Sequence, residues 1–301
     1  MTKNNIKNFF VMSVLIVSAL GMIQNNAFAA PTLGTASNFA VLGGTTVTNT
    51  GATIIIGDLG VSSPGVACTG IVGCTTTGLG TVSGTIHVGD PIANQAHADA
   101  ATAYGSLVGA TCTTIEPAVA DIGGQTLTPG VYCFPSSAAI TGTLTLDGAG
   151  VYIFKIGSTL VTAASNSQVV LTNGATANNV FWAVGSSATL GTNSVLEGTV
   201  IAYTSITATA GATVDGRLLA INGAVTLDTN NIAVVDTGNG NGNGNGNGGH
   251  DDDDDCTGGH GNGGHGNGNG GHDDDEHDDD GHDKDHKDKD HKDGKKKSGK
   301  N

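Results

Sequence analysis

A repeat of eighteen residues in the C-terminal half constrains this chain more than any other feature. Residues 189–202 are matched eighteen positions later by residues 207–220, with Glu197 opposite Asp215, and a shorter echo follows at 225–227. Each copy holds β-branched residues broken by Gly, Asn and Asp. A period near twenty residues of this kind is typical of one coil of a β-solenoid, with about three short strands per coil. Because one coil cannot bury its apolar side alone, we predict a mainly β domain of stacked coils.

The composition divides the chain into three parts. Residues 1–29 carry Lys3 and Lys7, then an apolar run at 9–23, then Ala27-Phe28-Ala29, which predicts a secretory signal peptide cleaved after Ala29. A retained membrane anchor is the alternative, but it requires about twenty apolar residues, more than this run supplies. Residues 30–236 are expected to fold, and residues 237–301 are expected to form a disordered tail.

Cysteine usage agrees with export into an oxidising compartment. Cys68 and Cys74 lie six residues apart, and Cys112 and Cys133 bracket a longer excursion, so we predict these two pairs as disulfides. Cys256 is left over. A zinc site is the competing interpretation, but the spacing does not give paired Cys-x-x-Cys motifs and no His accompanies them.

One segment departs from the strand pattern. Asp90 and Pro91 suit the cap and the first position of a helix, which we place at about 91–109. Its apolar positions follow at three- and four-residue spacing: Ile92, Ala96, Ala100, Ala103 and Leu107. Such a narrow Ala-rich face should pack closely against a sheet, so the helix is expected to run along the solenoid. His97 lies in this helix and is interpreted as an ordinary surface or boundary histidine, because one His without partners makes no site.

The charge pattern of residues 30–236 argues against two classes of function. Ten acidic residues stand against only Lys155 and Arg217, so we expect no nucleic-acid partner. The carboxylates follow a turn pattern beside glycines, and no catalytic constellation or cofactor motif is present, so we predict a non-enzymatic protein without a cofactor. Glu197 and Asp215, one coil apart, could form a glycosidase-like pair, which keeps an exported polysaccharide-active enzyme as a further alternative.

Several motifs resemble the bacterial and fungal ice-binding-like family over about residues 33–234. They are Asn49-Thr50-Gly51, Ile56-Gly57-Asp58-Leu59-Gly60-Val61-Ser62, Leu127-Thr128-Pro129-Gly130-Val131-Tyr132, Tyr152-Ile153-Phe154, Asn179-Val180-Phe181-Trp182, Gly185-Ser186-Ser187-Ala188-Thr189-Leu190-Gly191-Thr192 and Asn222-Gly223-Ala224-Val225-Thr226-Leu227. The resemblance implies a discontinuous right-handed β-solenoid with one long lateral helix. The chain segments before and after the helix are expected to interleave and so complete the coil stack. It also implies antifreeze or ice-adhesion activity through one flat solenoid face. With the predicted signal peptide, we expect a secreted or cell-surface protein.

Threonine is the residue expected on such a face, because it carries a methyl and a hydroxyl group on a stiff χ1. If the apolar residues of the repeat point inward, alternation turns a ladder of threonines outward. The predicted face is Thr189, Thr207, Thr209 and Thr226, flanked by Thr162 and Thr192, and interrupted by Val161, Gly191 and Asp228. The partner is then ice or an ordered water surface, bound by a monomer. Thr is also a common strand residue, so a structural or adhesive surface protein with the same fold is the alternative.

The tail suggests a separate property. Eight of the ten histidines lie in it among Asp runs, a composition that suits weak binding of divalent metals. The candidate ligands are His272, His277, His282, His286 and His291. A charged, solvating segment or a cell-surface attachment is the other interpretation of such a sequence.

Overall fold

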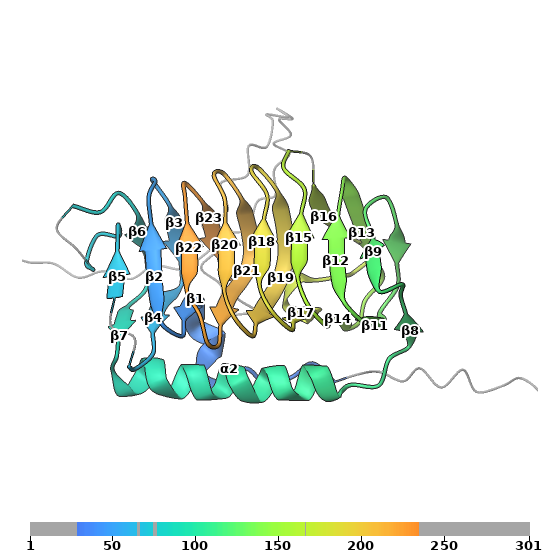
Figure 1. Cartoon of the computed structure of the whole chain (residues 1–301), viewed down its shortest axis with the longest axis horizontal. Coiled ribbons are helices and arrows are strands. Elements are labelled where there is room, and N and C mark those ends of the chain that lie inside the picture. The colour runs from blue at the N-terminus through green and yellow to red at the C-terminus, as the bar shows by residue number, and fades with distance from the viewer. Residues whose placement is uncertain (1–28, 65–66, 75–76, 166, 235–301) are drawn as a thin grey trace, which may run out of the picture. The chain divides into compact units, whose positions relative to one another are not determined.

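The computed structural model describes residues 29–64, 67–74, 77–165 and 167–234. Within them, parallel strands wind into a β-solenoid with three faces, as predicted (Figure 1). Two of the faces belong to one continuous sheet, because its longest strands bend at a corner and contribute to both.

The first face, called here the eight-stranded face, is a sheet of its own. Its strands, in spatial order, are β5 (Ala67–Thr69), β2 (Thr46–Asn49), β22 (Val225–Leu227), β20 (Ile206–Ala208), β18 (Ala188–Leu190), β15 (Leu160–Thr162), β12 (Ser137–Ile140) and β9 (Val119–Asp121).

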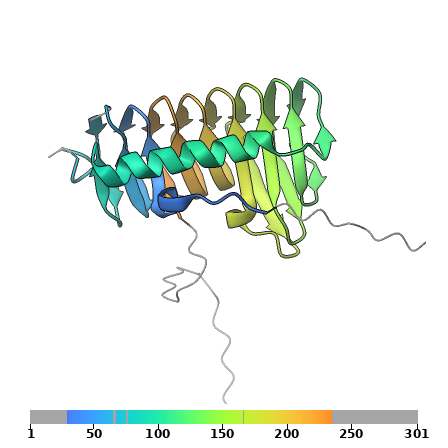
Figure 2. The ribbon, with the colours of Figure 1, turned by 90° about the horizontal axis from the view of Figure 1, so that it is seen from below.

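The second face, the helix-covered face, packs against the long helix α2 (Pro91–Gly109) (Figure 2). It contains β7 (Ile86–Val88), β4 (Asp58–Val61), β1 (Phe39–Gly43), the second halves of β21 (Thr213–Ala220) and β19 (Val195–Ala202), β17 (Val180–Val184), β14 (Tyr152–Ile156), β11 (Gly130–Phe134) and β8 (Thr114–Ile115).

The third face is called the acidic face, because it carries the carboxylates of Asp147, Glu197 and Asp215. It contains β6 (Thr81–Val82), β3 (Ile54–Ile56), β23 (Asn231–Ala233), the first halves of β21 and β19, β16 (Gln168–Thr172), β13 (Thr143–Asp147) and β10 (Thr126–Leu127). Two short 3-10 helices, η2 (Gly34–Asn38) and η3 (Ala177–Asn179), precede β1 and β17.

The coil stack is discontinuous in sequence. The first coils of the chain, β1 to β3, pair with the last ones, since β1 pairs with β21, β2 with β22 and β3 with β23. Helix α2 then carries the chain back to β8 at the opposite end, where stacking resumes. Eight strands spaced by about 4.8 Å span roughly 34 Å, and a 19-residue helix covers about 28 Å of that length. The length of the helix therefore matches the stack that it must traverse.

Glycines shape the corner between the acidic and helix-covered faces. Gly198 in β19 and Gly216 in β21 pair in register and have φ values of +104° and +154°. A Cβ at Gly198 would overlap the carbonyl oxygen of Val180 on the neighbouring coil. Only glycine permits this turn, which explains why the sequence repeat places Gly after Glu197 and after Asp215.

Two hydrophobic clusters hold the fold together. The inner cluster fills the solenoid and includes a stack of Tyr132, Phe154 and Trp182, with Phe154 and Trp182 ring centroids 4.0 Å apart. The outer cluster lies between the sheet and α2 and uses the alternate residues of the same strands, such as Ile153 and Phe181. Strands of the helix-covered face are thus buried on both sides, which explains their continuous apolar runs.

Helix α2 has the bounds that the sequence predicts, and Asp90 caps it by accepting a hydrogen bond from the Ala93 backbone nitrogen at 2.8 Å. One predicted packing position is wrong: Ile92 is 49% exposed, whereas Ala93 is buried in its place. The reason is helical phase, because the buried stripe continues back from Ala96 to Ala93. His97 bonds the Ile221 carbonyl oxygen and so ties the helix to the solenoid.

Both predicted disulfides are present, Cys68–Cys74 and Cys112–Cys133. In the described part of the chain, no helix is long and apolar enough to span a bilayer. The proposed signal peptide lies outside the described residues.

Candidate functional site

The eight-stranded face carries one continuous column of outward side chains. Strand register places one outward-pointing residue of each strand beside the next, and the first five are threonines. In spatial order the column is Thr69, Thr48, Thr226, Thr207, Thr189, Val161, Ala139 and Asp121. We call the five threonines the threonine row.

Alternation along each strand explains why these residues face out. On β20, Ile206 and Ala208 are buried in the core and Thr207 between them is partly exposed. The same pattern holds around Thr226 on β22 and around Thr189 on β18. The outward direction of the threonines is therefore set by their strand neighbours, which pack into the core. The face is flat because the coils stack in register.

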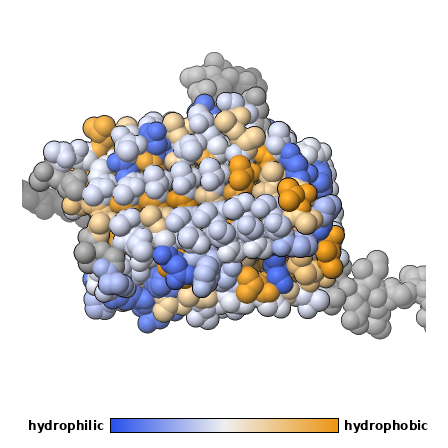
Figure 3. Space-filling model, in the orientation of Figure 1, coloured by the Kyte–Doolittle hydropathy of each residue, from blue (hydrophilic) through white to orange (hydrophobic). Residues whose placement is uncertain are grey.

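The hydroxyls of the row face solvent. Thr48 Oγ1 lies 3.4 Å from Thr226 Oγ1, the one contact between adjacent members. Among the described residues, the Thr207 and Thr189 hydroxyls make no hydrogen bond within the protein, so they are free to bind water. Figure 3 shows this face toward the viewer, with side chains of intermediate hydropathy over its middle strands.

A second row of small polar side chains lies at the entrance of the same strands. Thr159 Oγ1 donates to Ser137 Oγ at 2.9 Å, and the backbone nitrogen of Ser205 donates to Ser187 Oγ at 3.4 Å. The Ala224 nitrogen donates to Ser205 Oγ at 3.3 Å. These hydroxyls are held in place by their neighbours along the stack, so they extend the face with oriented polar groups.

The structure separates the predicted threonines. Thr189, Thr207 and Thr226 lie together in the threonine row. Thr209 and Thr192 lie at the following corner, with hydroxyl oxygens 3.3 Å apart, and Thr209 also donates to the Leu190 carbonyl oxygen at 2.8 Å. The expectation that Thr162 flanks the face is wrong, since it is 3% exposed and its hydroxyl accepts a hydrogen bond from the Gly191 nitrogen at 2.8 Å.

The predicted interruptions also fall in distinct places. Val161 occupies the sixth position of the column and is 42% exposed, so it ends the threonine row. Gly191 is buried at a corner and lies off the column. Asp228 follows the last residue of β22 at the margin, where its backbone nitrogen donates to Asn230 Oδ1 at 2.7 Å.

Two members of the row, Thr48 and Thr69, are absent from the sequence-based prediction. In the strand Thr46–Asn49, apolar Val47 is buried, and this marks the next residue, Thr48, as an outward candidate. Its place in the row depends on the pairing of β2 with β22, across the whole chain. No local pattern reveals that pairing.

The acidic face differs in chemistry. Glu197 and Asp215 are register partners on adjacent coils, as the repeat suggests. Burial, followed by the repulsion of Asp215, raises the pKa of Glu197 from 4.5 to about 7. Exposed Ile54 and Ile56 lie on the same face. The acidic face is therefore a mixture of carboxylates, amides and aliphatic groups without a uniform row.

No group of three or more His, Cys, Asp or Glu residues that could hold a metal ion is found among the described residues. The candidate tail ligands His272, His277, His282, His286 and His291 lie outside the described part of the chain, so metal binding by the tail stays a prediction.

Comparison with known proteins identifies the relatives of this domain. The model of the ice-binding-like family matches residues 41–233. A protein of Nostoc sp. strain HG1 named as an ice-binding protein is 49% identical over 202 residues, which cover 64% of this chain and 71% of that protein. Ice-binding protein 1 of Shewanella frigidimarina is 33% identical over 67% of this chain but only 25% of its own length.

Solved structures agree with this relationship. The crystal structure of an ice-binding protein from the Antarctic ascomycete Antarctomyces psychrotrophicus aligns with a TM-score of 0.65 and 45% identity, over 69% of this chain and all of that one. An ice-binding protein from an Antarctic biological consortium aligns with the same TM-score at 44% identity, over 70% of this chain.

Proposed function

Because this chain belongs to the ice-binding-like family, we propose that it binds ice and that the threonine row of its eight-stranded face is the surface that does so. The relatives named as ice-binding proteins support the activity. The continuous row of Thr69, Thr48, Thr226, Thr207 and Thr189 is the observation that supports the surface.

The other two faces fit this role less well. Helix α2 and the outer hydrophobic cluster occupy the helix-covered face. The acidic face carries the partly buried carboxyls of Glu197 and Asp215 beside exposed aliphatic groups, so it offers no uniform row of hydroxyl and methyl groups. The eight-stranded face has one acidic residue in its column, Asp121, at the far end from Thr69.

The chemistry of the row explains how it would act. Each threonine offers a methyl group that repels water and a hydroxyl group that anchors it, on a side chain with few rotamers. Repetition at the strand spacing of about 4.8 Å holds the anchored waters in a regular array. Such an array merges with an ice surface at little entropic cost, because the protein side of the contact is already ordered.

The proposed activity is non-catalytic and needs no cofactor. The protein would act outside the cell or on its surface, as the predicted signal peptide suggests. Two disulfides in the domain are compatible with an oxidising compartment.

Thermal hysteresis and ice recrystallisation inhibition of the purified protein test the proposal, with Thr207→Tyr as the variant. Thr207 is central in the row, so a bulky ring there should lift the face from ice and remove most of the hysteresis. Thr145→Tyr is the matched control, because Thr145 is also a partly exposed strand threonine but lies on the acidic face. Equal hysteresis in Thr207→Tyr and the unmodified protein would reject the surface, and no hysteresis in the unmodified protein would reject the function.

A further inference from the structure

A hollow of about 650 Å³ opens between the end of α2, the segment that follows it and the helix-covered face. It reaches the corner that leads from the helix-covered face to the eight-stranded face, where Pro135, Gly157 and Gly185 line it. Figure 3 shows separate hydrophobic patches at this end of the domain, with hydrophilic side chains between them. Its lining includes Tyr104, Val108, Ile115, Phe134, Lys155 and Tyr203. The volume and the mainly apolar walls are those of small-molecule sites in proteins.

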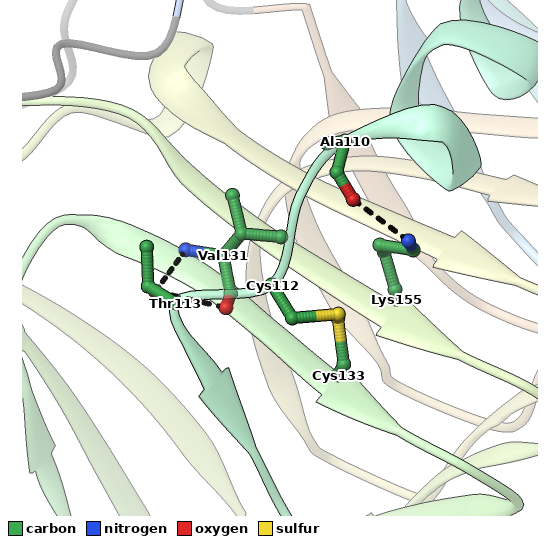
Figure 4. The surroundings of a disulfide bond; sticks show 6 residues. All are labelled: Ala110, Cys112, Thr113, Val131, Cys133 and Lys155. Atoms are coloured by element: carbon green, nitrogen blue, oxygen red, sulfur yellow. Dashed lines mark hydrogen bonds between the residues drawn. A yellow bond between two sulfur atoms is a disulfide. The ribbon is translucent and has the colours of Figure 1, made fainter.

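Lys155 supplies a positive charge to this hollow. Its Nζ donates to the Ala110 carbonyl oxygen at 2.8 Å, which leaves two of its three donors for another partner (Figure 4). No carboxylate lies within salt-bridge distance of Lys155 among the described residues. The other cation of the domain, Arg217, is buried and donates to the Ser37 carbonyl oxygen and the Thr199 hydroxyl.

Two tyrosines add polar groups at the hollow. Tyr104 on α2 and Tyr203 after β19 pack with ring centroids 6.0 Å apart, and Tyr203 is 51% exposed. The hydroxyls of Tyr132 and Tyr152 bond backbone carbonyl oxygens. Within the described part of the chain, the Tyr104 and Tyr203 hydroxyls make no such bond. They are thus available to a ligand.

The wall of the hollow is braced before any ligand arrives. The Cys112–Cys133 disulfide joins the segment after α2 to β11. Beside it, Thr113 Oγ1 donates to the Val131 carbonyl oxygen at 2.9 Å and accepts from the Val131 nitrogen at 2.8 Å (Figure 4). A pre-formed wall loses little conformational entropy on binding, which favours a specific site.

We propose that this hollow binds a small amphipathic anion, a medium-chain carboxylate with its chain against the apolar wall and its charged end at Lys155. Charge complementarity selects the anion, because Lys155 brings a cation without a paired carboxylate. The apolar lining selects the aliphatic body. The acidic tail of this chain fits less well, because residues 257–301 contain no large apolar side chain.

Isothermal titration of the purified protein with sodium octanoate below its micellar concentration tests the site, with octanol as the uncharged probe. We expect saturable binding of one octanoate and weaker binding of octanol. Lys155→Met should weaken octanoate binding by about tenfold or more, the loss of one charge-assisted contact, and leave octanol binding nearly unchanged.

Two substitutions of opposite charge at Ile115 keep the test decisive if Lys155→Met folds poorly. Ile115 lines the hollow and is 74% exposed, so the fold should tolerate both Ile115→Asp and Ile115→Arg. The proposal requires octanoate to bind more weakly to the Asp variant than to the Arg variant, with no such difference for octanol. Val72→Asp, at an exposed position outside the lining, is the control. No saturable heat, or binding that ignores the charge at both positions, would overturn the proposal.

Discussion

Thr48 and Thr226 lie side by side on the eight-stranded face, with hydroxyl oxygens 3.4 Å apart, although 178 residues separate them in sequence. This contact exists because the first coil of the chain stacks on the last one. The row of threonines is therefore assembled from both ends of the domain, and its length depends on correct closure of the discontinuous stack.

Extending the row should strengthen the activity. Val161 occupies the sixth position, so Val161→Thr would add a hydroxyl in register with Thr189. We expect higher thermal hysteresis at equal protein concentration, because more anchored waters join the array. Val170→Thr on the acidic face is the control and should leave hysteresis unchanged. Lower hysteresis in Val161→Thr, with the fold intact by circular dichroism, would contradict this expectation. It would mean that the methyl groups of Val161 favour ice binding more than a hydroxyl does.

The glycine corner should be sensitive to a single methyl group. Gly198→Ala places a Cβ against the Val180 carbonyl oxygen at a φ of +104°, and should lower the free energy of unfolding by about 3 kcal/mol. Gly142→Ala is a matched control, because Gly142 also has a positive φ, +84°, but no atom within 4 Å of the added Cβ. It should cost about 1 kcal/mol, measured by the same denaturant titration. Equal losses would show that close approach between coils plays no part.

Stability should fall as the pH rises through the range where Glu197 titrates. Burial and Asp215 raise the pKa of Glu197 from 4.5 to about 7, so between these values the folded state binds more protons than the unfolded state. The free energy of unfolding then decreases with increasing pH across this window. Glu197→Gln should flatten the profile of denaturation midpoint against pH from 4.5 to 7. An unchanged slope in that variant would assign the dependence to other groups.

The two disulfides should contribute differently to the free energy of unfolding. Cys112–Cys133 closes a loop of sequence separation 21, and its removal by the Cys112→Ser, Cys133→Ser double variant should cost about 3 kcal/mol. Cys68–Cys74, with a separation of 6, should cost about 2 kcal/mol. Thermal unfolding measures both. The variant without Cys112–Cys133 should keep its hysteresis near 0 °C if it remains folded, because that bond lies away from the threonine row, whereas Cys68 adjoins Thr69 on β5.

Much of the fold follows from local pattern. The eighteen-residue spacing of Glu197 and Asp215 corresponds to one coil, and Asp90 begins the helix where capping rules place it. Strand register is harder to predict, because a shift of one residue turns every side chain to the other side. Thr162 shows this: Leu160 two positions earlier points inward, so Thr162 must do so too, and the Gly191 nitrogen satisfies its hydroxyl.

Only part of the threonine row can be predicted from the sequence. Thr189, Thr207 and Thr226 belong to consecutive coils of the repeat, so local alternation finds them. Thr48 and Thr69 belong to coils that precede the helix, and their place depends on a pairing with no counterpart in local sequence. The hollow near Lys155 is likewise a product of tertiary packing, since its lining comes from α2, β8, β11, β14 and the turns between coils.

Ice binding by the eight-stranded face is tested most directly by the thermal hysteresis of Thr48→Tyr beside that of Thr145→Tyr, at matched concentration and with circular dichroism to confirm folding. Thr48 belongs to the threonine row only through the pairing of β2 with β22, whereas Thr145 lies on the acidic face. We expect Thr48→Tyr to lose most of the hysteresis and Thr145→Tyr to keep it. Full hysteresis in a folded Thr48→Tyr, or its loss in Thr145→Tyr alone, would contradict the claim that the eight-stranded face binds ice.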